Sequence, residues 1–116
     1  MIVTERKTDV FNQRAGGKGE TIMEHIVDEK LYGGKIITYA RVILKPGCSL
    51  GLHKHVGTSE TMYLLQGTGL YNYNGKESTL HAGDVTFCPE NESHSIENIG
   101  NDDLMIMALI VNTKEE

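Results

Sequence analysis

The sequence has few of the features that mark several common classes of protein. Its two cysteines, Cys48 and Cys88, are not spaced as a C-x-x-C metal pair. No apolar run is long enough to span a bilayer, and the first ten residues lack the apolar core of a signal peptide. The net charge is −5 and no basic run is present, so we expect neither nucleic acid nor a membrane as partner. A cytoplasmic location with reduced thiols follows as the expectation.

The length and composition are those of one ordinary globular domain. The chain has 116 residues, of which 39% are hydrophobic and 23% charged, enough for a single core and too few for two. We expect residues 1–20 to form an N-terminal arm with room for one short strand, and residues 21–116 to form the domain. No segment sustains a helical period over eleven or more residues.

Short strands separated by turns are the dominant pattern instead. Thirteen glycines and only two prolines indicate many tight turns. Asn74-Gly75 is a two-residue hairpin signal, because both positions tolerate a positive φ. The predicted strands are residues 21–27, 36–44, 60–65, 69–73, 77–80, 85–88, 94–98 and 104–111. This spacing predicts a single all-β domain, a sandwich or barrel.

Three candidate metal ligands fall within eight residues, and a fourth follows later. On a strand, His53 and His55 point to the same face, and Glu60 can return on the neighbouring strand toward the same place. His94 opens a later strand. Three imidazoles and one carboxylate suit a divalent Mn, Fe, Co, Ni, Cu or Zn ion and leave positions open for water or substrate. A lone H-x-H pair, in contrast, is often a surface accident.

These residues belong to a longer pattern that resembles the cupin superfamily. The first motif of that superfamily, G-x5-H-x-H-x4-E-x6-G, is matched by Gly47, His53, His55, Glu60 and Gly67. The second, G-x5-P-x-G-x2-H-x3-N, is matched by Gly83, Pro89, His94 and Asn98. Asn91 stands where the second motif has glycine, and asparagine also adopts the left-handed conformation. The resemblance covers residues 47–98, nearly half of the chain.

The resemblance carries expectations for fold, cofactor and assembly. It implies a double-stranded β-helix, or jelly roll, that encloses one divalent transition metal ion per chain, with Mn, Fe, Ni and Zn as the candidates. It also implies a homodimer. The metal ligands that it implies are His53, His55, Glu60 and His94.

Four further residues are candidates for contact with a small-molecule ligand. Arg41 lies in the middle of the strand at 36–44. Its side chain either projects into the barrel, where it would bind a carboxylate, or is paired on the outside, and both alternatives are open. Met62 and Leu64 share the face of Glu60, and Ile96 shares that of His94, so these three would make the cavity mostly apolar.

The remaining notable side chains have simpler interpretations. His25 and His81 match neither motif, and His81 falls in a polar turn, where we expect it to be exposed. Tyr63, Tyr71 and Tyr73 are interpreted as packing residues. Cys88 is interpreted as a small buried hydrophobic residue rather than a nucleophile.

Two classes of function remain open at this point. One is a metal-dependent enzyme that acts on a small carboxylate- or oxygen-rich substrate by oxidation, decarboxylation, isomerisation or lyase chemistry. The other is a non-catalytic metal-containing module that binds a sugar or a small acid. The segment ARVILKPG resembles the strand before the metal motif of oxalate-degrading cupins. In oxalate decarboxylases, however, a substrate-handling arginine lies three residues before the first metal histidine, and that position is Leu50 here. Inward titratable residues beyond the ligands would favour catalysis, and apolar surroundings would favour binding.

Overall fold

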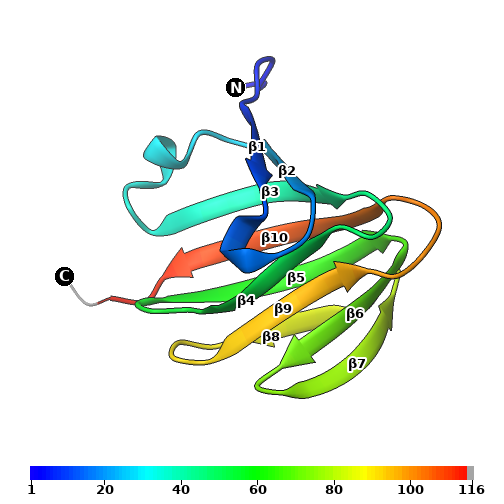
Figure 1. The fold of residues 1–116 in the computed structure, drawn as a ribbon. Helices are drawn as coiled ribbons and strands as arrows, with labels where there is room; N and C mark the ends of the chain where they lie inside the picture. The colour runs from blue at the N-terminus through cyan, green and yellow to red at the C-terminus, as the bar shows by residue number, and fades with distance from the viewer. Residues whose placement is uncertain (115–116) are drawn as a thin grey trace.

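Two antiparallel sheets face each other in the computed structural model, which describes residues 1–114 (Figure 1). The larger sheet has six strands in the order β1-β2-β3-β10-β5-β8, and the smaller has four in the order β4-β9-β6-β7. Every pairing between neighbouring strands is antiparallel. The predicted all-β class and jelly-roll arrangement are confirmed.

The predicted strands β3 and β8 agree with the structure to the residue, and the others differ by a few residues at their ends. Neither of the two short 3-10 turns was predicted. At three and four residues, neither described helical turn approaches the length needed to cross a bilayer.

The elements are β1 (Thr8–Asn12), η1 (Arg14–Gly16), β2 (Glu20–His25), η2 (Glu29–Tyr32), β3 (Ile36–Leu44), β4 (Ser49–Lys54), β5 (Thr58–Gln66), β6 (Thr68–Tyr73), β7 (Lys76–His81), β8 (Val85–Cys88), β9 (Ser93–Asn98) and β10 (Leu104–Asn112).

The core lies between the two sheets and follows the two-residue period of the strands. Along β3, alternate residues from Thr38 to Leu44 are buried, and the residues between them are more exposed. Strand β10 runs between β3 and β5 and contributes Leu104 and Ile106, both with no exposed surface. Burial of each such side chain favours folding by about 1.5–3 kcal/mol. This layer holds the strands that position the candidate ligands.

Asparagine and glycine occupy turn positions that have a positive φ. Asn74 and Gly75 have φ values of 51° and 91° between the paired residues Tyr73 and Lys76, so the predicted hairpin turn is confirmed. Asn91 has φ 70°, which confirms that asparagine takes the left-handed conformation in the place of the motif glycine. Gly67 has φ +92°, and a Cβ on it would lie 2.9 Å from the Asp103 carbonyl oxygen, so the end of β5 requires glycine.

Asn98, the last residue of the second motif, supports the fold rather than a ligand. It is 1% exposed. Its Nδ2 donates to the carbonyl oxygens of Leu44 and Asp102, both at 2.8 Å, and its Oδ1 accepts from the Gly100 N–H at 2.9 Å. These bonds tie the end of β3 to the turn after β9. They hold in register the strand on which His94 lies.

The N-terminal segment touches both sheets. Strand β1, the short strand expected in the arm, pairs with β2 at the edge of the larger sheet. The turn η1 then packs against β4 of the smaller sheet, which is visible in Figure 1 as the blue turn beside β4. The boundary between arm and domain at residue 20 stays a prediction.

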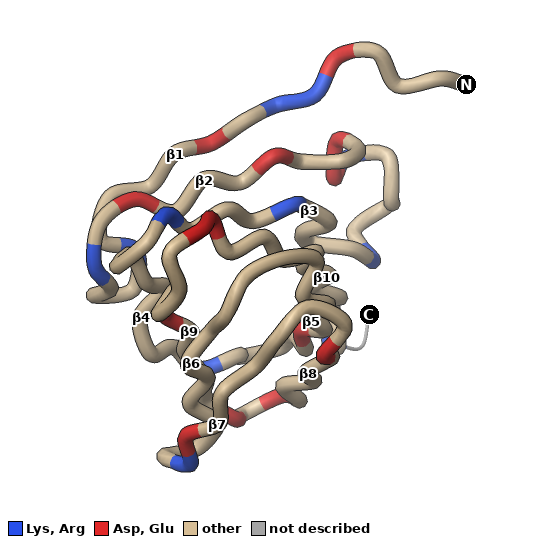
Figure 2. Tube along the Cα trace, turned by 90° about the vertical axis from the view of Figure 1, so that its right-hand side faces the viewer, with Lys and Arg blue, Asp and Glu red and all other residues tan. Residues whose placement is uncertain are grey.

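Figure 2 shows residues of both signs on the N-terminal segment and on both sheets, so that neither sign is confined to one part of the trace. That nucleic acid is not a partner stays a prediction.

Candidate metal centre

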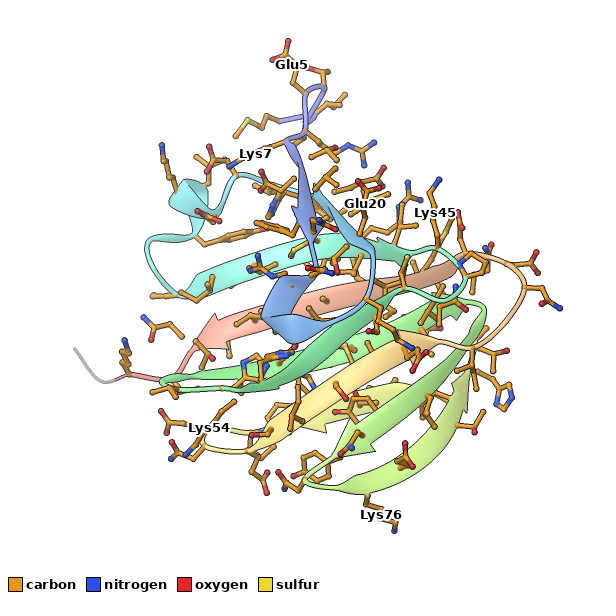
Figure 3. All side chains as sticks on the ribbon, in the orientation of Figure 1. Glu5, Lys7, Glu20, Lys45, Lys54 and Lys76 are labelled. Atoms are coloured by element: carbon orange, nitrogen blue, oxygen red, sulfur yellow. The ribbon has the colours of Figure 1, made fainter. Side chains whose placement is uncertain are left out.

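The four predicted ligands meet at one place between the two sheets. His53 lies on β4 and His55 follows it, Glu60 is on β5, and His94 is on β9. Strands β4 and β9 belong to the smaller sheet and β5 to the larger. Lys54, between the two histidines, points out of the molecule (Figure 3). We call His53, His55, Glu60 and His94 the four-residue cluster.

A bulge in β4 sets the direction of His53. In the β4–β9 register, Leu50 pairs with Ile96 and His53 pairs with His94, so β4 has one more residue than β9 between these two pairs. The bulge therefore turns Leu50 and His53 toward the same side, although an unbroken strand would place them on opposite faces. The sequence contains no local signal for it apart from Gly51.

The ligand atoms of the cluster lie close together. The Nε2 atoms of His55 and His94 are 2.9 Å apart. Glu60 Oε1 lies 2.8 Å from His94 Nε2, 3.1 Å from His55 Nε2 and 3.9 Å from His53 Nε2. One ligand atom from each residue falls within 4.8 Å of all the others. The structure thus brings together all four residues that were predicted from the sequence as metal ligands.

Each histidine is oriented through its other ring nitrogen. His53 Nδ1 lies 2.8 Å from the Gly51 carbonyl oxygen, which can only accept, so Nδ1 carries the proton and Nε2 is left as a ligand. His55 Nδ1 lies 3.0 Å from the Thr58 hydroxyl, and His94 Nδ1 lies 2.8 Å from the Tyr71 hydroxyl. Burial raises the pKa of Tyr71 to about 12, so this hydroxyl stays protonated at neutral pH. Such outer hydrogen bonds are the usual support of metal-bound histidines.

Electrostatics favour a negative carboxylate inside the cluster. Burial disfavours the charged form of Glu60, but hydrogen bonds with His53, His55 and His94 outweigh burial and hold the pKa of its carboxyl well below the ordinary value. Burial also lowers the pKa of His53, but the hydrogen bonds with Glu60 and Gly51 are stronger and raise it overall. The cluster is therefore built for positive charge at its centre.

The donor set fits a divalent metal ion. In the tautomer that binds a metal, each ring carries its proton on Nδ1, and the Nε2 atoms of His55 and His94 then lie 2.8–3.1 Å from each other and from the Glu60 carboxylate. Such a contact is repulsive unless protons or a cation lie among the atoms. Ligands bound at about 2.1 Å to one octahedral ion lie about 3.0 Å apart, close to these separations. The cluster therefore offers the donor types and the close spacing that such an ion requires.

A cavity of about 480 Å³ opens on the cluster. His53, His55 and Glu60 form one side of it, and Arg14 and Ala15 of the N-terminal turn form part of another. The rest of its lining is apolar or hydroxylic: Thr21, Met23, Thr38, Val42, Leu50 and Ile110. Its volume is in the range of small-molecule sites.

The four candidate ligand-contact residues take different places. Arg41 points to the outer face of the larger sheet, where its Nη2 lies 2.5 Å from Glu24 Oε1. Its buried neighbours Ala40 and Val42 occupy the inner face. This corrects the alternative in which the Arg41 side chain projects into the barrel. Met62 and Ile96 border a narrow recess beside His94. Leu64 packs in the core with no exposed surface. Contact of Met62, Leu64 and Ile96 with a ligand stays a prediction.

Two side chains at the site were missed from the sequence. Tyr71 was interpreted as packing, yet it bonds to His94, because the β6–β9 register places Tyr71 opposite Ile96, which lies two residues from His94 on the same face of β9. Arg14 was assigned to the N-terminal arm. No local sequence pattern reports either arrangement, since both depend on pairing between distant segments. Cys88, in contrast, is fully buried as expected, and burial raises the pKa of its thiol to about 11.

Comparisons with known proteins agree with this geometry. Residues 40–111 match the family described as Cupin domain. An "Oxalate-binding protein" from Thermotoga maritima is 48% identical over 102 residues, which cover 88% of this chain and 84% of that protein. An oxalate decarboxylase from Bacillus subtilis is 32% identical over 80 residues, which cover 65% of this chain and 21% of that protein.

Solved structures of other proteins have the same fold as this chain. A crystal structure of a "predicted oxalate decarboxylase" from Thermotoga maritima matches with a TM-score of 0.90 at 43% identity, covering 97% of this chain and 99% of that one. A polyketide cyclase from Streptomyces resistomycificus matches with a TM-score of 0.75 at 18% identity, covering 98% and 78% of the two chains. The second likeness concerns the fold alone.

Proposed function

The chain belongs to the cupin family, and on that premise we propose that it binds a small carboxylic acid, with oxalate as the leading ligand, at a divalent metal ion. The four-residue cluster would hold the ion. The name of the 48% identical relative supports oxalate. When bound, the ion would supply a Lewis-acidic centre for carboxylate oxygen atoms.

The observation that carries binding, as opposed to turnover, is the composition of the cavity lining. Among the described residues that line the cavity, Arg14 is the only one outside the cluster with a titratable side chain. Arginine keeps its proton at any ordinary pH and cannot serve as a general acid or base. Leu50 lies in the lining at the position where oxalate decarboxylases carry their substrate-handling arginine. Proton transfer requires a general acid or base beside the substrate, whereas binding of an acid does not.

A metal-dependent enzyme is the second candidate. Similarity to the Bacillus subtilis oxalate decarboxylase favours it. The hydroxyl of Tyr71, which bonds to His94, is a protonated group close to the cluster. In this alternative the substrate would still enter the same cavity, and the reaction would be a decarboxylation or oxidation of a small acid.

One experiment separates these functions. Untagged protein is loaded with Mn²⁺, and oxalate binding is measured by titration calorimetry against the same protein stripped with a chelator. We expect saturable binding to the loaded protein and at least about tenfold weaker binding to the stripped protein. Carbon-13 NMR of labelled oxalate should show no formate or carbon dioxide. Catalytic accumulation of formate would establish the enzyme instead, and absence of oxalate binding to loaded protein would refute the proposal.

We also propose that the chain forms a homodimer through the outer face of the larger sheet. Tyr63, Val85 and Phe87 are 48%, 61% and 58% exposed on β5 and β8, and Tyr63 pairs directly with Val85. Exposed apolar groups of this size in one place are typical of an interface. Light scattering should give twice the chain mass, and a monomer at all concentrations would contradict the proposal. The choice among Mn, Fe, Ni and Zn and the cytoplasmic location stay predictions.

A further inference from the structure

Two polar side chains from the N-terminal part of the chain line the cavity outside the cluster. Arg14 belongs to the turn η1, and Thr21 belongs to β2. They are linked through Phe11. Phe11 pairs with Thr21 across β1 and β2, and the Arg14 guanidinium lies 3.8 Å above the centre of the Phe11 ring. Arg14 and Thr21 therefore belong to one local unit, which we call the N-terminal wall.

Arg14 is held in place without a carboxylate partner. The face of the Phe11 ring attracts its positive charge. Within residues 1–114, the ion pairs of the structure do not include Arg14, whereas Arg41 is paired with Glu24. The five N–H donors of Arg14 are thus available to an anion in the cavity.

Thr21, the other polar member of the N-terminal wall, is sealed from solvent. The residue is 1% exposed, and its buried hydroxyl oxygen has no hydrogen-bond partner among the described residues. The same holds for the hydroxyl of Thr86, which does not line this cavity, so the missing partner does not indicate a ligand. Arg14 is the polar side chain of the wall that is open to the cavity.

The N-terminal wall is anchored to the strand that carries the first histidine. The Ser49 N–H donates to the Lys18 carbonyl oxygen at 2.8 Å, and the Lys18 N–H donates to the Ser49 hydroxyl at 2.9 Å. A Cβ on Gly51 would lie 2.0 Å from the Ala15 carbonyl oxygen, so η1 and β4 are in backbone contact. Arg14 is therefore positioned relative to the cluster by β4.

We propose that Arg14 forms a carboxylate subsite in the cavity that opens on the four-residue cluster, so that the ligand is a dicarboxylate. This inference rests on the proposed function. One carboxylate would lie at the cluster, and the other would accept hydrogen bonds from the guanidinium. The cavity volume of about 480 Å³ leaves room for longer dicarboxylates than oxalate.

The test compares affinities of Mn²⁺-loaded protein for acetate, oxalate, malonate and succinate. In Arg14→Gln, the affinity for at least one dicarboxylate should fall about tenfold, as expected for loss of a charge-assisted hydrogen bond. Acetate affinity and the metal content should stay unchanged in this variant. Arg41→Gln, the matched control on the outer face, should bind every ligand as the wild type does.

The outcomes separate this inference from the proposed function. If no carboxylate binds to the loaded wild type, the proposed function fails. If dicarboxylates bind equally to the wild type and to Arg14→Gln, only the subsite fails. Arg14→Lys keeps the charge without the fork of donors, so it should recover part of the affinity. A drop of acetate affinity equal to that of the dicarboxylate would show that Arg14 serves the structure and would overturn the subsite.

Discussion

The cavity has a ligand side, which consists of the four-residue cluster on β4, β5 and β9, and an N-terminal side, which consists of the N-terminal wall. On the ligand side, His55, Glu60 and His94 are 5%, 4% and 1% exposed, and His53 is half-buried. The N-terminal side combines the buried Thr21 with Arg14, which is exposed at the surface. The first side carries the carboxylate of Glu60, and the second carries the guanidinium of Arg14.

This difference separates two tasks. Charges interact strongly in the buried cluster, because the surroundings are poorly polarisable. The ligand side can therefore retain a cation against competition from water. An exposed guanidinium interacts weakly and is screened by salt. The N-terminal side is thus suited to selecting among ligands rather than to holding the metal, and each side should fail separately when it is altered.

The largest expected effect is on metal retention and concerns the ligand side alone. In His55→Ala, loss of one of four buried donors should weaken metal binding at least about a hundredfold, beyond the tenfold to hundredfold typical of outer-shell changes. Elemental analysis of untagged protein, with a chelator competition for the affinity, measures this. His81→Ala is the control, because His81 is exposed on β7. Equal metal content in both variants would mean that the cluster is not the metal site.

A smaller effect is expected from the hydroxyl that orients His94. Tyr71→Phe removes the oxygen 2.8 Å from His94 Nδ1 and should weaken metal binding about tenfold. Tyr71 is a positioning residue here, so the visible spectrum of Co²⁺-loaded protein should also change. Tyr63→Phe, on a side chain that is 48% exposed, should leave both unchanged. An unaltered affinity and spectrum in Tyr71→Phe would show that the hydroxyl does not orient the ligand.

The two sides also differ in how far they could be predicted from the sequence. The cluster was predicted from spacing, because His53, His55 and Glu60 lie within a single strand–turn–strand unit and His94 fits the second motif. Strand β3 was predicted to the residue because Ile36–Leu44 is rich in β-branched and aromatic residues and ends at the turn Lys45-Pro46-Gly47. In these places the local pattern and the tertiary structure agree.

The rest depends on contacts between distant segments. The inward or outward direction of Arg41 was left open, because β-branched and aromatic residues occur on both faces of β3. The bulge between Leu50 and His53 is visible only in the pairing of β4 with β9. Arg14 precedes a polar, glycine-rich stretch that resembles a loop, and its place in the cavity depends on η1 packing against β4. None of these arrangements has a signature within a window of neighbouring residues.

The smallest effect should come from loosening the N-terminal wall without touching any polar side chain. Gly17 has the extended conformation φ −74°, ψ −174°, which alanine adopts easily, but a Cβ there would lie 2.1 Å from the Ser49 carbonyl oxygen. Gly17→Ala should push η1 away from β4, destabilise the fold by about 1–3 kcal/mol, and weaken dicarboxylate binding about threefold through Arg14. Metal content should not change, since the added Cβ meets Ser49 and Gly51 rather than a residue of the cluster.

Gly100→Ala is the matched control for this variant, because its Cβ would meet the nearest atom at an ordinary 3.5 Å. It should melt, bind metal and bind dicarboxylates as the wild type does, as measured by thermal denaturation, elemental analysis and calorimetry. Loss of metal in Gly17→Ala would mean that the N-terminal wall supports the cluster and that the two sides are one unit. Unchanged dicarboxylate affinity in a destabilised Gly17→Ala would mean that contact with β4 is not what positions Arg14. Only a loss of ligand affinity without a loss of metal agrees with two sides that act separately.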